Sequence, residues 1–198
     1  PPDLVAAAAT LPTATLHEAG GKIGALPSAI KPVAPQFRFA GQALTVHSPG
    51  GDNLWLHRAL EVSQAGDVLV VFANGAYEHG YWGEITTTMA KVRGMAGLVI
   101  DACVRDGVLL GEIGFPVFAR GLCIRGTGKD FGATGWINHP VQIGDVISCY
   151  STIERIGNTS MKIRIEVWET ADPCQPPVKL TEGVFTYVAI DETGRPRA

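Results

Sequence analysis

The stretch GEITTTMAKVRGMAGLVIDACVRD, Gly83–Asp106, joins a helix pattern to a strand pattern and ends in two opposite charges. Its first half predicts a helix over about 83–93, which Gly94 ends. The run from Gly97 to Asp101 is apolar almost throughout, as in strands that are buried on both faces. The stretch therefore predicts a helix that leads into a central strand. Three apolar residues at helical spacing lie on one side of this helix: Ile85, Met89 and Val92.

A second buried strand is predicted immediately before this stretch, by the run DVLVVFA at Asp67–Ala73. Two such strands with a helix between them form a parallel unit, and its connection is expected to be right-handed. Ligands of open parallel sheets collect outside the carboxyl ends of the strands. The loop at residues 74–84 and the Arg105-Asp106 pair both emerge at that edge, so we expect the functional site there.

The Arg105-Asp106 pair offers two complementary kinds of chemistry. A carboxylate oxygen is a ligand for a hard divalent cation, and the planar guanidinium of an arginine binds a carboxylate through two parallel hydrogen bonds. The alternative is an ordinary solvated ion pair in a surface loop. The buried strand that precedes the pair favours a site.

Other segments complete an α/β domain. Residues 1–40 combine a short apolar helix candidate with proline-punctuated extended chain. A strand is predicted at Gly41–His47. Asp52 or Asn53 can cap a helix over Leu54–Ala65. We therefore expect an α/β domain over residues 1–146.

The C-terminal segment, residues 147–198, has a different pattern. Strands are predicted at Ser148–Ile156, Lys162–Trp168 and Val184–Ile190, with a proline-rich excursion at Pro173–Pro177 between the last two. The middle strand alternates apolar and charged residues, which is typical of an antiparallel meander with one wet face. We expect an antiparallel β-meander in this segment.

Composition excludes several classes of function. The 198 residues are 46% hydrophobic and 18% charged, and 19 acidic against 16 basic residues give a formal charge of -3 without long charge runs. Neither a nucleic-acid footprint nor a polybasic membrane patch is visible. The four cysteines form no C-x-x-C motif, which suits a reducing compartment. The apolar run at Leu4–Leu11 is too short to span a bilayer. We expect a cytoplasmic protein with small-molecule partners.

Six stretches between Thr13 and Val146 carry a resemblance to known proteins: LPSAIKPV, GDVLVV, GYWGE, RGMAGLVIDACVRD, FPVFARG and RGTGKD. Over this part the chain resembles the family that contains the regulator of ribonuclease activity A and the class II pyruvate aldolases, typified by 4-hydroxy-4-methyl-2-oxoglutarate aldolase. The resemblance implies a swivelling β/β/α domain assembled into homotrimers or homohexamers, with Mg²⁺ or Mn²⁺ bound near a subunit boundary.

Carried over residue by residue, the resemblance assigns Asp106 as the direct metal ligand. Arg105 would contact the carboxylate or enolate oxygen of the substrate. Glu84 matches an acidic position that holds water beside the metal, although an acidic residue there also compensates the charge of a helix N-terminus.

The resemblance also implies substrate-binding positions besides Arg105. The helix start at Gly83, with the backbone N–H groups of Ile85 and Thr86, would cradle the pyruvyl carboxylate, since free N–H donors and the helix dipole favour an anion. Thr127 and Lys129 match polar residues that point into the same cleft. A solvated loop lysine is the alternative for Lys129.

The C-terminal segment resembles another family. It looks like the C-terminal half of a hotdog-fold acyl-CoA thioesterase, and the two resemblances overlap around HPVQIGD, His139–Asp145. In those thioesterases the catalytic acidic residue and the central helix belong to the N-terminal half, which has no counterpart in this sequence. A fusion within the shared run is the interpretation that fits both.

Three functions follow as hypotheses. The first is a divalent-metal-dependent lyase that cleaves a 4-hydroxy-2-oxo acid, of the 4-hydroxy-4-methyl-2-oxoglutarate type, to pyruvate and a second carbonyl compound without a Schiff-base lysine. The second is a non-enzymatic regulator that binds a ribonuclease. The third is acyl-CoA hydrolysis through the C-terminal segment, for which we expect no activity above background.

Overall fold

The computed structural model describes residues 2–22, 24–141, 143, 147–157, 160–169 and 178–188. The chain divides into two compact units, Pro1–Gly144 and Asp145–Ala198. Within the described residues no helix is long and apolar enough to cross a bilayer.

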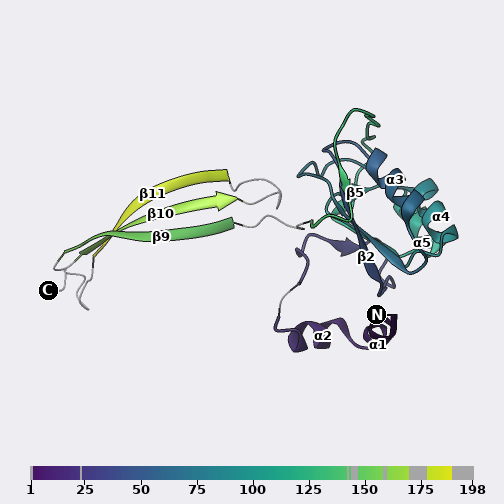
Figure 1. The fold of residues 1–198 in the computed structure, drawn as a ribbon, viewed down its shortest axis with the longest axis horizontal. Helices are drawn as coiled ribbons and strands as arrows, with labels where there is room; N and C mark the ends of the chain where they lie inside the picture. The colour runs from purple at the N-terminus through teal and green to yellow at the C-terminus, as the bar shows by residue number, and fades with distance from the viewer. Residues whose placement is uncertain are drawn as a thin grey trace. The chain divides into compact units, whose positions relative to one another are not determined.

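The first unit is built on a six-stranded sheet in the order β1-β6-β4-β3-β2-β8 (Figure 1). The four inner strands run parallel, and the short strands at the two edges pair antiparallel to them. All three strands predicted for this unit are confirmed to within one residue at each end. The strands are β1 (Lys31–Pro32), β2 (Gln42–His47), β3 (Asp67–Phe72), β4 (Gly97–Ile100), β6 (Val117–Ala119) and β8 (Trp136–Ile137).

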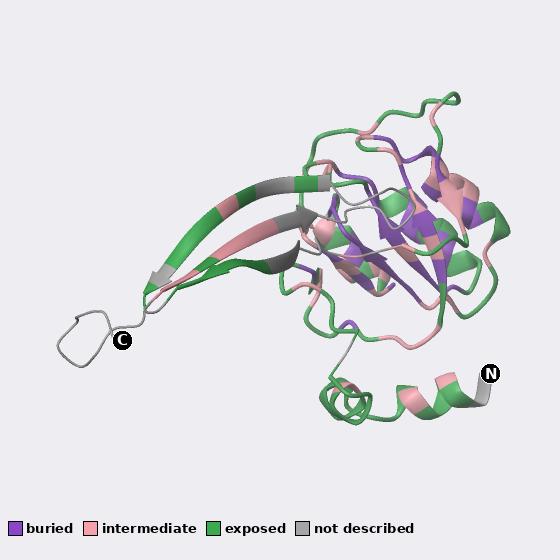
Figure 2. Ribbon diagram, turned by 60° about the vertical axis from the view of Figure 1, so that its left-hand side comes forward, coloured by how far each residue is buried: buried purple, intermediate pink, exposed green. Residues whose placement is uncertain are grey.

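Three helices pack on one face of this sheet and enclose the main core, drawn in purple in Figure 2. They are α3 (Leu54–Val62), α4 (Glu84–Val92) and α5 (Gly107–Ile113). Two helices precede the sheet in the chain, α1 (Pro2–Ala9) and α2 (Thr13–Ala19). A smaller apolar cluster of Ile30, Val68 and Val99 forms outside the main core.

Helix α4 turns a different side to the core from the one that its apolar stripe suggests. Thr87 and Ala90 are fully buried, whereas Ile85 is 67% and Val92 is 83% exposed. The indole N–H of Trp82 donates to the hydroxyl of Thr87 at 2.6 Å, so a polar side chain is satisfied inside the core. The buried residues of α4 have small side chains, and the apolar stripe is left on the surface of this chain.

A two-stranded parallel ladder continues the carboxyl edge of the sheet. It consists of β5 (Cys103–Val104), which follows β4, and β7 (Gly121–Leu122), which follows β6. Asp101 and Ala102, between β4 and β5, are completely buried. This extension places Arg105 and Asp106 just beyond the carboxyl end of a buried strand, as the sequence predicts.

The second unit is an antiparallel sheet in the order β11-β10-β9, which confirms the predicted meander. Its charged face is cross-linked between strands by ion pairs, among them Arg164 with Glu154 at 2.6 Å and Lys179 with Glu166 at 2.7 Å. The predicted excursion at 173–177 lies outside the described residues. The strands are β9 (Ile147–Ile156), β10 (Ser160–Glu169) and β11 (Val178–Val188).

Candidate functional site

The loop at residues 74–83 is held against the β5 ladder strand by backbone hydrogen bonds. The Cys103 N–H donates to the Tyr77 carbonyl at 2.9 Å, and the Tyr81 N–H donates to the Cys103 carbonyl at 3.2 Å. One step further, the Arg105 N–H donates to the Trp82 carbonyl at 2.8 Å. These bonds bring the first residues of α4 beside the end of β5, although a helix and a strand separate them in the chain.

Two glycines make room for Arg105 and Asp106. A Cβ atom on Gly83 would overlap the Asp106 Oδ2 atom and lie 3.0 Å from both Cγ and Nε of Arg105. A Cβ atom on Gly80 would overlap the Cys123 carbonyl oxygen and lie 3.1 Å from the Arg105 Cβ atom. Only a residue without a side chain fits at either position with the present packing.

Asp106 has a left-handed backbone conformation, with φ 59° and ψ 35°. Asp and Asn adopt this conformation more readily than most residues with a side chain. Its Oδ2 atom accepts a hydrogen bond from the Glu84 N–H at 3.0 Å and lies 3.7 Å from the Arg105 Nε atom. The side chains of Arg105 and Asp106 are 48% and 36% exposed, so both remain open to a ligand.

The N-terminus of α4 presents unused donors next to this pair. The Thr86 hydroxyl exchanges hydrogen bonds with the Gly83 N–H and carbonyl, at 3.1 and 3.0 Å, and the Thr87 N–H donates to the Gly83 carbonyl. The N–H groups of Ile85 and Thr86 have no acceptor in the part of the chain that the structure describes. An anion bound here would accept hydrogen bonds from them and interact favourably with the helix dipole.

The structure thus brings together six of the predicted site residues: Gly83, Glu84, Ile85, Thr86, Arg105 and Asp106. The side chain of Thr86 is buried and caps the helix, which leaves its backbone N–H for a ligand. Glu84 is exposed, and its carboxylate makes no ion pair with any residue that the structure describes.

Lys129 contacts Asn53 and not the six residues of the site. Its Nζ atom donates to Oδ1 of Asn53 at 3.1 Å, and the Asn53 side-chain amide donates to the Tyr81 carbonyl at 2.9 Å. Lys129 therefore links its loop to the start of α3 and to the 74–83 loop. Thr127 lies half-buried in the same loop as Lys129. Neither side chain forms a described hydrogen bond with Arg105, Asp106 or Glu84.

The site offers few protein ligands to a cation. The described part of the chain holds no group of three or more His, Cys, Asp and Glu residues that could bind a metal together. Mg²⁺ keeps several water ligands and is commonly held by one or two carboxylates together with substrate oxygens. The Asp106 carboxylate, which is part-exposed and engages the protein through Oδ2, therefore fits an oxygen-bound cation of this kind.

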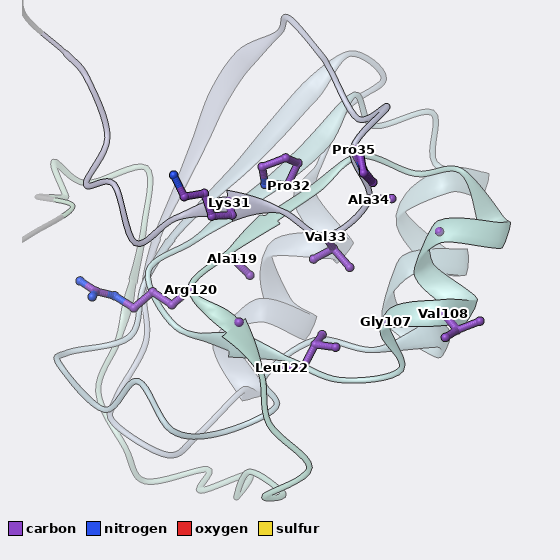
Figure 3. Close-up of a pocket in the computed structure, with 12 residues that line it drawn as sticks. Lys31, Pro32, Val33, Ala34, Pro35, Gly107, Val108, Ala119, Arg120 and Leu122 are labelled. Atoms are coloured by element: carbon purple, nitrogen blue, oxygen red, sulfur yellow. The ribbon is translucent and has the colours of Figure 1, made fainter.

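A surface pocket of about 490 Å³ lies between the β1 segment, α5 and β7 (Figure 3). Its walls are mostly apolar and include Val33, Ala34, Val108 and Leu122. Arg105 and Asp106 do not line it. This pocket is separate from the candidate site, although Gly107 follows Asp106 directly.

Sequence reasoning missed a charged pair beneath the site. Asp101 is completely buried, and its Oδ1 atom accepts a hydrogen bond from the Arg120 Nε atom at 2.6 Å. The Arg120 guanidinium lies over the Tyr77 ring, 3.8 Å from the ring centroid. The available signal was an acidic residue at the end of an otherwise apolar strand, because a buried carboxylate requires a partner.

Comparisons with known proteins match the two parts of the chain to different families. The RraA-like family (Aldolase/RraA) matches residues 4–153, and the thioesterase superfamily matches residues 138–173. The two matches overlap in the region of the shared run at His139–Asp145.

A putative 4-hydroxy-4-methyl-2-oxoglutarate aldolase from Halalkalibacterium halodurans is 34% identical over 144 residues, which are 73% of this chain and 68% of that protein. Acyl-CoA thioester hydrolase YciA from Escherichia coli is 45% identical over 62 residues, which are 30% of this chain. The chain spans 47% of the length of that hydrolase.

The solved structure of the RNA-processing inhibitor RraA from Thermus thermophilis is also similar. It is 27% identical with a TM-score of 0.59, and the match covers 66% of this chain and 78% of that one. The family match over residues 4–153 and the similarity to the Halalkalibacterium protein show that the chain belongs to the RraA-like (Aldolase/RraA) family.

Proposed function

We propose that the chain is a divalent-metal-dependent lyase that cleaves a 4-hydroxy-2-oxo acid, of the 4-hydroxy-4-methyl-2-oxoglutarate type, to pyruvate and a second carbonyl compound. The observation that supports it most is the contact of Asp106 with the start of α4, beside Arg105. This arrangement combines a cation ligand, a guanidinium and free helix N–H groups within one exposed site. The similarity to a putative aldolase supports the same assignment.

Asp106 would hold Mg²⁺ or Mn²⁺ through its carboxylate. A divalent ion there supplies Lewis-acid charge that polarises the 2-oxo group of the substrate. The other groups of the site belong to the chain itself and can be assigned separate tasks.

Substrate binding is assigned to Arg105 and the start of α4. The N–H groups of Ile85 and Thr86 would bind the carboxylate next to the 2-oxo group, and Gly83 keeps this approach free of a side chain. Arg105 would stabilise the negative charge that develops on the enolate oxygen. Its guanidinium would stabilise the transition state more than the bound substrate, and this difference lowers the barrier. Thr127 and Lys129 remain candidates for contacts with the distal part of the substrate.

Glu84 is assigned as the base for the C4 hydroxyl, directly or through one water molecule. As the hydroxyl proton moves to this base, the C4–O bond becomes a carbonyl and the C3–C4 bond breaks. Its electron pair forms the C2–C3 double bond of pyruvate enolate, which then takes up a proton at C3. No step requires an oxidant or a covalent adduct with a lysine.

A pyruvate-release assay with metal titration on the purified oligomer tests this function. Excess chelator should abolish cleavage, and added Mg²⁺ or Mn²⁺ should restore it. Undiminished cleavage of the 4-hydroxy-2-oxo acid in excess chelator would reject the proposal.

We also propose that the chain works as a homotrimer or homohexamer. Apolar side chains exposed on α4 and α5 support an interface with further copies, because large apolar patches on a surface mark association sites. Light scattering on the purified chain should give three or six times the mass of one chain. The most exposed of these side chains are Ile85, Val92 and Val108, at 67%, 83% and 77%.

A ribonuclease-binding regulator is the second candidate, and the similarity to the Thermus RNA-processing inhibitor favours it. Specific co-purification of a ribonuclease, together with no affinity for Mg²⁺ or Mn²⁺, would place this function first. A thioesterase assay with an acyl-CoA tests the third hypothesis, and we expect background activity because the chain spans less than half of YciA.

A further inference from the structure

The guanidinium of Arg120, which lies outside the candidate site, contacts the 74–83 loop through Tyr77. Arg120 follows β6 and is largely covered, with a side chain that is 21% exposed, whereas the side chain of its partner Asp101 is not exposed at all. Figure 3 shows the Arg120 side chain extending away from the wall of the pocket that Val33 and Leu122 form. The Arg120 guanidinium instead reaches Asp101 and the ring of Tyr77.

Tyr77 connects this pair to the site through the backbone. Its ring lies under the Arg120 guanidinium at 3.8 Å, and its carbonyl accepts the hydrogen bond from the Cys103 N–H that begins the pairing with β5. Two further bonds of that pairing lead from Tyr81 to Cys103 and from Arg105 to the Trp82 carbonyl. The next residue is Gly83, where the start of α4 meets Asp106.

We propose that Arg120 is a positioning residue, which holds Tyr77 and thereby the 74–83 loop so that the α4 N-terminus lies against Arg105 and Asp106. The inference rests on the function proposed above for those residues. Arg120 itself touches neither the proposed cation nor the substrate. Its role is to fix how far the Glu84 N–H lies from the Asp106 carboxylate.

The chemistry of the contact explains why an arginine stands here. A guanidinium can bind a carboxylate at its edge and stack on an aromatic ring with its face, and a lysine ammonium cannot do both in the same geometry. Asp101 requires a partner because an unpaired carboxylate in the core is strongly disfavoured. The ion pair therefore supports folding, whereas the stacking on Tyr77 links the pair to the loop.

The variants are chosen to change the stacking on Tyr77 without removing the charge that Asp101 requires. Tyr77→Leu removes the ring and leaves the Asp101-Arg120 ion pair in place. Tyr77→Phe keeps the ring and is the matched control. Arg120→Lys retains a positive charge for Asp101 and loses the planar face. A variant that removes Asp101 would test folding and not positioning, so it is not needed.

Two measurements are made on each full-length variant. Hydrogen exchange of the backbone N–H groups of Cys103, Arg105 and Glu84 reports the pairing of the loop and the contact with Asp106. Titration with Mn²⁺ alone reports the affinity of Asp106. In Tyr77→Leu and Arg120→Lys we expect faster exchange at these positions, unchanged exchange in β3, and Mn²⁺ affinity weakened by about fivefold. Tyr77→Phe, which keeps the ring, should stay closer to the parent than Tyr77→Leu in both measurements.

Parent-like exchange at all three positions in both Tyr77→Leu and Arg120→Lys would overturn the proposal. Equally faster exchange in β3 would show that the contact supports overall stability only, which also overturns it. If the parent protein binds no Mn²⁺, the proposed lyase function fails, whereas the exchange data still decide whether Arg120 positions the loop.

Discussion

The backbone N–H of Glu84 donates to Oδ2 of Asp106, so one carboxylate joins the first turn of α4 to the end of the β5 strand. The bond fixes the side chain of Asp106, while the rest of the carboxylate stays part-exposed. The same contact therefore orients the carboxylate that we propose as the cation ligand.

Asp106→Asn should remove cation binding with little effect on the fold. Asparagine tolerates the left-handed conformation at φ 59° and retains an oxygen that can accept the Glu84 N–H. It lacks the charge that a hard cation requires, so we expect Mn²⁺ affinity to fall by about 100-fold, with the melting temperature nearly unchanged. Calorimetric titration and thermal unfolding measure the two quantities. Retention of the parent's Mn²⁺ affinity would exclude Asp106 as the ligand.

Gly83→Ala should disable the site through steric overlap. The new Cβ atom would meet Oδ2 of Asp106 and crowd the Arg105 side chain, so either the pair or the α4 N-terminus must move. We expect pyruvate release to fall by about 100-fold, since a displacement of 1 Å in a catalytic group has an effect of that size.

The matched control for this substitution is Gly111→Ala. Gly111 lies inside α5, and a Cβ atom there meets only the Ala34 Cβ atom, at an ordinary 3.7 Å. Alanine also favours the helix, so the control should be at least as stable as the parent and fully active. Equal activity of the two variants would show that the space at Gly83 has no functional role.

His57 should make folding sensitive to mild acid. Burial lowers its pKa, and the nearby Lys129 ammonium lowers it further, against the opposite effects of Asp52 and Glu61. As the pH falls through the ordinary histidine value of about 6.5, the unfolded chain takes up the proton first. The free energy of unfolding should therefore decrease below that pH and be unaffected by His57 above it.

Urea unfolding of the parent and of His57→Gln, from about pH 8 to about pH 5, measures this contribution. The variant should show a weaker loss of stability on the acid side. An identical pH dependence in both proteins would contradict a lowered pKa for His57.

The central strands β3 and β4 could be predicted from sequence because both are apolar almost throughout. The run Asp67–Ala73 is apolar almost throughout, which is typical of a strand that is covered on both faces. The helix pattern that follows it indicates a crossover to a parallel strand. The strand at Gly97–Ile100 likewise placed Arg105 and Asp106 at its carboxyl end. Local pattern was sufficient for these elements.

Contacts between segments that are distant in sequence could not be predicted from local pattern. Periodicity identifies the apolar stripe at Ile85 and Val92, but it does not show what the stripe faces. In the structure the stripe lies on the surface of the chain. The hydrogen bond of Lys129 to Asn53 joins residues far apart in sequence, so a loop lysine could not be assigned from its own surroundings. The contact of Arg120 with Tyr77 likewise depends on how two loops meet.

Arg105→Lys should change both KM and kcat, whereas Glu84→Gln should change kcat alone, if the proposed roles are correct. An ammonium cannot reproduce the two parallel donors of a guanidinium, so Arg105→Lys should raise KM and lower kcat together, with kcat/KM reduced by about 1000-fold. Glu84→Gln keeps the backbone N–H that binds Asp106 and removes only the base. Its kcat should fall by about 100-fold, while KM and Mn²⁺ affinity remain near the parent values.

Steady-state pyruvate release and Mn²⁺ titration on both variants provide the measurements. A loss of Mn²⁺ affinity in Glu84→Gln would mean that the Glu84 carboxylate helps to hold the cation. The assignment of Asp106 as the single protein ligand would then be wrong. Parent-like kcat in Glu84→Gln with intact Mn²⁺ binding would instead assign the proton transfer to another group. Glu84 donates its N–H to Asp106, and Arg105 lies beside the same carboxylate. The different outcomes of the two substitutions therefore separate substrate binding from proton transfer within one site.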